Sequence, residues 1–169
     1  MSNLRFFDET NEDQNNQDLL PITGYESMPL VTLEKAVEPI EMFLYDLKDK
    51  VQRAKQNCRH LESSCLTQDE AAAIYIYTME WAPVECCLYH LLNQTLRHRN
   101  RHELIPWFSY LKLLLTALFK LPSIKKTVWR GVKLNLQYPD SMKFAWWSFI
   151  SCTESLTILE SEAFLGKGH

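Results

Sequence analysis

Two stretches decide the expected fold: Thr127-Val-Trp-Arg-Gly-Val132 and Lys143-Phe-Ala-Trp-Trp-Ser-Phe-Ile-Ser-Cys-Thr153. Both are rich in β-branched and aromatic residues, which are enriched in strands. Between them lies Tyr138-Pro-Asp-Ser141, which has the composition of a turn. The two stretches therefore predict consecutive strands of one sheet.

The sequence before these stretches has a helical pattern. Apolar residues follow helical spacing from Leu33 onward, with an interruption at Pro39. Thr67-Gln-Asp-Glu70 has the form of a capping box and predicts the start of a helix. Further helices are expected over residues 84–96 and over the apolar run 104–121, and a short one over 156–165. The residues expected to face the core of the first and third helices are Ile40, Phe43, Leu44, Leu47, Val51, Ala54, Cys87, Leu88, Leu91 and Leu92.

These elements predict an α+β fold, with an N-terminal helical subdomain followed by the first strands of a sheet. Residues 1–29 are acidic and rich in Asn and Gln, so we expect a flexible lead-in there. Residues 30–169 are expected to form one domain, helical to about residue 121 and with strands and a short helix after it. A length of 169 residues fits a single domain with a sizeable core.

Composition excludes several classes of function. The chain has 18 Lys and Arg against 21 Asp and Glu, a net charge of −3, whereas nucleic-acid binding normally requires a basic excess. Its 4 glycines cannot form a phosphate-binding loop of the usual kinds. Lys112 lies near the middle of the run 104–121, which favours a buried helix over a membrane span.

The N-terminus resembles no secretory signal or transit peptide, so an intracellular location is expected.

The 5 cysteines are odd in number and irregular in spacing, a pattern that argues against a disulfide framework or a zinc site. We expect reduced thiols, most of them buried, and no bound metal.

Arg130 is the first candidate for a binding role. It stands on a predicted strand among apolar residues, and burial of a guanidinium is costly unless it meets an anion. The anion is either one of the chain's own carboxylates or a bound phosphate or carboxylate, and the residues alone do not favour one of these. Gly131 would let a ligand approach the backbone.

Ser151-Cys152-Thr153 is the second candidate, because it follows a dense aromatic run. Its hydroxyls either satisfy nearby backbone groups or line a pocket beside the large rings. Both explanations remain open from the sequence.

Val-Trp-Arg-Gly-Val at 128–132, followed by Trp-Trp-Ser-Phe-Ile-Ser-Cys-Thr at 146–153, resembles the first two signature strands of the arginine-specific mono-ADP-ribosyltransferases. The stretches 66–78 and 91–97 resemble the helices that precede the sheet in that family. The resemblance extends from about Leu33 to the C-terminus. It implies a partial ADP-ribosyltransferase domain over 30–169, with the first strands of the family's mixed β-sheet.

The resemblance also implies a function and residue roles. ADP-ribose would pass from NAD, or NADP, to an arginine of an acceptor protein, with release of nicotinamide. Arg130 would bind the diphosphate, and Gly131 would offer backbone groups to the nicotinamide amide. Ser151 would support the catalytic Glu and the nicotinamide ribose, and Thr153 would keep the hydroxyl of the family's last Ser. Cys152 replaces a Thr and is expected to face the core.

The family's catalytic Glu-x-Glu is expected several strands further along than His169, which implies a truncated domain that can hold NAD but hardly turns it over alone. Glu160-Ser-Glu162 has the same letters but is expected on a helix, where residues two apart point in different directions. Two alternatives remain: a non-catalytic helical interaction module with Trp146 and Trp147 on its binding face, and an NAD-binding protein that transfers nothing.

Overall fold

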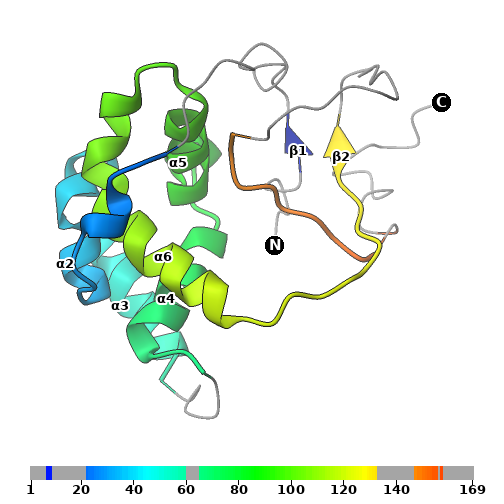
Figure 1. Cartoon of the computed structure of the whole chain (residues 1–169), viewed down its shortest axis with the longest axis horizontal. Helices are drawn as coiled ribbons and strands as arrows, with labels where there is room; N and C mark the ends of the chain where they lie inside the picture. Colours follow the sequence, from blue (N-terminus) through cyan, green and yellow to red (C-terminus); the bar gives the residue numbers. More distant parts are fainter. Residues whose placement is uncertain (1–6, 9–21, 60–64, 133–146, 156, 158–169) are drawn as a thin grey trace. The chain divides into compact units, whose positions relative to one another are not determined.

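The computed structural model describes residues 7–8, 22–59, 65–132, 147–155 and 157, which are mainly helical (Figure 1). The chain divides into two compact units. One is Leu20–Ser123, here called the helical unit, and the other combines Met1–Leu19 with Ile124–His169 and is here called the second unit.

The helical unit contains five α-helices and four short 3₁₀ helices among its described residues. In chain order these are η2 (Tyr25–Ser27), α2 (Leu33–Val37), η3 (Glu38–Phe43), α3 (Leu47–Asn57), α4 (Gln68–Thr78), η4 (Val84–Cys86), α5 (Leu88–Arg97), η5 (Arg101–Trp107) and α6 (Phe108–Lys120). Helix α6 packs against α2 and α4, and α4 also packs against α3 and α5. The four expected helical regions therefore exist, with 3₁₀ turns where prolines interrupt them.

The core of the helical unit lies where α4 and α6 meet. Ala72, Ala73 and Ala117 are fully buried, and their small side chains let the two helices approach closely. The hydroxyl of Tyr110 on α6 donates a hydrogen bond of 2.9 Å to the Ala73 carbonyl on α4. Larger residues fill the surrounding space, and those without exposed surface include Leu33, Ile40, Ile76, Leu88, Leu92 and Leu111.

The capping box predicted at the start of α4 is confirmed. The Thr67 hydroxyl accepts from the Glu70 backbone N–H at 3.3 Å, and the Glu70 carboxylate accepts from the Thr67 N–H at 2.9 Å. Glu70 is almost fully buried, and Lys120 at the end of α6 donates to both of its carboxylate oxygens at 2.7 and 2.8 Å. The start of α4 is thus tied to the end of α6.

Gly24 forms a close contact before the first turn of the helical unit. Its φ is 106°, in the region that favours glycine. A Cβ atom built on Gly24 would lie 2.9 Å from Cε2 of Phe108. Both the backbone and the neighbouring ring therefore require glycine here.

The expected core of the first helical region is only partly correct. Helix η3 ends at Phe43, and α3 begins after Asp46, whose φ is 53°. Because the chain leaves the helix here, Phe43 is 49% exposed, whereas Leu44 and Leu47 on either side of the bend are buried. In α5, Leu91 is half-buried, whereas the expected Cys87, Leu88 and Leu92 are buried.

The predicted α+β class, with the first strands of an ADP-ribosyltransferase-type mixed sheet, is wrong for the described residues. β1 (Phe7–Asp8) and β2 (Gly131–Val132) pair in parallel over two residues, and Trp129 forms a single antiparallel bridge with Thr153. No longer ladder occurs among the described residues. β-propensity reflects how well a residue fits a packed, pleated surface, so β-branched and aromatic residues alone do not create a sheet.

Several predictions fall on residues outside the described ranges. These are the turn at 138–141, residues 143–146 of the second strand, the helix at 156–165 apart from Thr157, and most of the lead-in 1–29. Among the described residues, none of the helices has both the length and the apolar character that crossing a bilayer requires.

Candidate functional site

The main chains of the two sequence-predicted site segments lie side by side in the second unit. The Trp129 N–H donates to the Thr153 carbonyl at 2.7 Å, and the Thr153 N–H donates to the Trp129 carbonyl at 2.9 Å. Arg130 and Gly131 directly follow one member of this bridge, and Ser151 and Cys152 directly precede the other. Two segments about twenty residues apart in sequence are therefore joined at the point where the motifs stand.

Arg130 is half-buried, but the two apolar residues before it are not part of a core. Val128 and Trp129 are 49% and 45% exposed. The expectation that Arg130 lies in a buried strand is wrong, because this segment is held by one bridge and not by a packed sheet. Gly131 begins β2 and aligns with Phe7 of β1.

The side chain of Thr153 makes a local hydrogen bond. Thr153 Oγ1 accepts from the Ser155 N–H at 3.2 Å, which corresponds to the backbone-satisfying role considered from the sequence. Ser151 is half-buried. Cys152 is exposed, so the expectation that it faces the core is wrong. Lys126 forms an ion pair of 2.7 Å with Glu154, the residue after Thr153.

Only some of the remaining predicted residues lie in the part of the chain that the structure describes. Trp146, Glu160 and Glu162 lie outside the described residues, and Trp147 is half-buried. The cysteines are less buried than expected: Cys58 and Cys87 are buried, Cys86 is intermediate, and Cys65 is exposed like Cys152. In the described ranges, no three His, Cys, Asp or Glu residues gather in a way that could hold a metal ion.

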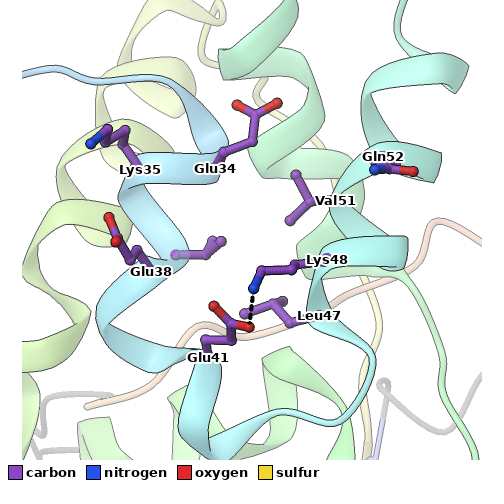
Figure 2. Close-up of a pocket in the computed structure, with 9 residues that line it drawn as sticks. Glu34, Lys35, Glu38, Glu41, Leu47, Lys48, Val51 and Gln52 are labelled. Carbon is purple, nitrogen blue, oxygen red and sulfur yellow. Dashed lines mark ion pairs between the residues drawn. The ribbon is translucent and has the colours of Figure 1, made fainter.

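Sequence reasoning missed two hollows in the helical unit. The first, of about 430 Å³, lies between α3 and the α2–η3 segment, where Glu41 and Lys48 meet at 2.7 Å (Figure 2). The second, of about 590 Å³, is lined by residues 41–49 and Cys86. The two hollows share Glu41, Leu47 and Lys48. Neither includes a predicted site residue.

Ion pairs around the first hollow raise the pKa values of two lysines. The hydrogen bond and charge of Glu41 raise the pKa of Lys48, and Glu38 adds to this effect. Burial alone would lower the pKa of Lys55, but Glu34 and Asp69 outweigh it and raise the pKa. Lys55 contacts these two carboxylates at 2.8 and 3.0 Å. The carboxylates therefore control the titration of both lysines.

Comparisons of this chain with protein-family models, with curated proteins and with solved structures give no match. Its function is therefore inferred from its own residues and their arrangement.

Proposed function

We propose that this chain acts in NAD-dependent ADP-ribosyl transfer to arginine. The observation that carries the proposal is the bridge between Trp129 and Thr153, because it joins the two segments whose motifs resemble those of the arginine-specific mono-ADP-ribosyltransferases. Arg130, Gly131, Ser151 and Thr153 are the proposed NAD-binding residues, and NADP is an alternative substrate.

The chemistry of these side chains suits a dinucleotide. A guanidinium presents paired donors that match the oxygens of a diphosphate, and it stays charged at all physiological pH values. Gly131 has no side chain that would keep a ligand away from the backbone. The half-buried Ser151 hydroxyl can donate to a ribose oxygen.

In the proposed reaction, the glycosidic bond between ribose and nicotinamide breaks, and a bond forms from the ribose carbon to a guanidine nitrogen of the acceptor. Nicotinamide leaves and the guanidinium loses a proton. A carboxylate that stabilises the oxocarbenium-like ribose contributes a factor of about 10²–10³ in comparable sites. The resemblance assigns this role to a Glu-x-Glu motif, whereas Glu154 forms an ion pair with Lys126 at 2.7 Å.

Binding of NAD is tested on the full chain by saturation-transfer NMR. We expect NAD signals with the wild-type protein, no signals with Arg130→Ala, and weakened binding with Arg130→Lys, because an ammonium lacks the planar paired donors. Arg99→Ala is the matched control, since Arg99 is an exposed arginine of the helical unit. A folded wild-type protein without NAD signals would contradict the proposal.

A transfer experiment separates the transferase from a protein that binds NAD and transfers nothing. Labelled NAD is incubated with the chain and an arginine-rich acceptor protein, and the label on the acceptor is measured. Label that depends on Arg130 supports transfer. NAD binding without any label would leave only the binding role.

A further inference from the structure

The bend between η3 and α3 exposes a cluster of large apolar side chains. Met42 is 83% exposed, Tyr45 is 79% exposed and Phe43 is 49% exposed. All three line the hollow of about 590 Å³. Exposed apolar side chains that gather beside a hollow are typical of interaction sites. This cluster therefore indicates an interaction site at residues 41–49, which are here called the acidic–aromatic loop.

Two buried leucines and a backbone hydrogen bond hold the acidic–aromatic loop against the core. Leu44 and Leu47 are 4% and 2% exposed, and they anchor the loop to the core on both sides of Asp46. The Asp46 carbonyl accepts from the Lys50 N–H at 3.1 Å at the start of α3. A loop already fixed in one conformation loses little entropy when it binds a partner.

The loop and its surroundings carry an excess of negative charge. The two hollows are lined by five carboxylates (Glu34, Glu38, Glu41, Asp46 and Asp49) and by two ammonium groups (Lys35 and Lys48), a net charge of −3. Lys48 neutralises Glu41, and Lys55 neutralises Glu34. Within the described part of the chain, Glu38, Asp46 and Asp49 form no ion pair.

We propose that the acidic–aromatic loop is a docking surface for an arginine-rich segment of a partner protein. A guanidinium can stack on the rings of Tyr45 and Phe43 while it pairs with the adjacent Asp46 carboxylate. Arginine fits this surface better than lysine because its planar group stacks on aromatic faces. This inference is independent of the proposed NAD site, since it uses other residues in the other unit.

The test uses a fluorescein-labelled peptide of alternating arginine and glycine, titrated with the full chain and followed by fluorescence anisotropy. Neutralising the free carboxylates with Glu38→Gln, Asp46→Asn and Asp49→Asn together should weaken binding about tenfold, as expected for three exposed ion pairs. Asn is chosen at position 46 because it tolerates a positive φ. Tyr45→Ala should weaken binding by a factor of about three.

Two control variants test whether the loss of affinity is specific to the acidic–aromatic loop. Glu103→Gln removes a surface carboxylate elsewhere on the helical unit, and Phe119→Ala removes a ring that is 79% exposed on α6. Neither should change the affinity. Circular dichroism of every variant confirms that the helices remain.

Three results would overturn the proposal. One is the absence of peptide binding by the wild-type chain. Another is equal binding of a peptide in which glutamate replaces arginine. The third is sedimentation showing that a second copy of the chain, through its basic segment 97–102, occupies the loop and excludes the peptide.

Discussion

At the scale of single residues, the buried carboxylate of Glu70 links the stability of the fold to pH. Burial alone would raise the pKa of this carboxyl, but hydrogen bonds from Lys120 and from the Thr67 backbone outweigh burial and lower it. The charged form is therefore favoured in the folded protein. A group whose folded pKa is depressed stabilises the fold above its unfolded pKa and loses that contribution as the pH falls.

Glu70→Gln should reduce the free energy of unfolding by about 1–2 kcal/mol at pH 7, since Gln keeps the cap but loses the charged hydrogen bonds to the half-exposed Lys120. The difference from wild type should shrink as the pH falls below about 4.3, the usual pKa of Glu in an unfolded chain. Urea unfolding at several pH values measures this. A difference that stays constant down to pH 3 would contradict the assignment, and Glu103→Gln serves as the exposed control.

At the scale of the elements, the contact between α4 and α6 includes one buried hydroxyl, that of Tyr110. Burial strongly raises the pKa of Tyr110, so its phenol stays protonated and continues to donate to the Ala73 carbonyl. Tyr110→Phe should lower the free energy of unfolding by about 1–2 kcal/mol, because a buried hydrogen bond between the two helices is lost. Thermal unfolding is the measurement. Tyr45→Phe, at an exposed position, should leave stability within about 0.5 kcal/mol of wild type.

The helices were predictable where their signals are local. The capping box at Thr67 involves residues three apart, and the apolar run 104–121 contains its own periodicity, so neither depends on distant partners. Phe43 was assigned wrongly because helical spacing cannot reveal that the chain bends at Asp46. The sheet was predicted wrongly because strand formation depends on partners far away in sequence. Among the residues that the structure describes, 127–132 pair only at Trp129 and over β2.

For the candidate site, the sequence indicated which segments are involved but not how they pair or which side chains are exposed. The motifs identified two segments that the structure pairs at Trp129 and Thr153, although no periodicity gave their register. The exposure of Cys152 could not be predicted, since it depends on what packs against the bridge. The acidic–aromatic loop was missed because Phe43 falls on the expected core face, and the bend that exposes it together with Met42 and Tyr45 has no signal in the helical spacing.

At the scale of the whole molecule, the chain crosses from one unit to the other through residues 121–129, all of which are exposed. Exposed extended chain is the usual site of first proteolytic cleavage. Brief trypsin digestion should therefore cut after Lys125 before it cuts within α3 or α6, which both contain lysines. Mass spectrometry identifies the products, and circular dichroism should show that the fragment carrying the helical unit keeps its helices. Earlier cleavage inside α3 or α6 would contradict the division into units.

Gly24 has an evolutionary consequence. Two separate restrictions apply there, the φ of 106° and the 2.9 Å approach of the Phe108 ring to a built Cβ. Shrinking the ring would lift only the second, because the backbone angle would still disfavour any side chain. In divergent descendants of this chain that preserve the turn, position 24 should therefore stay glycine even where position 108 has drifted to a smaller residue.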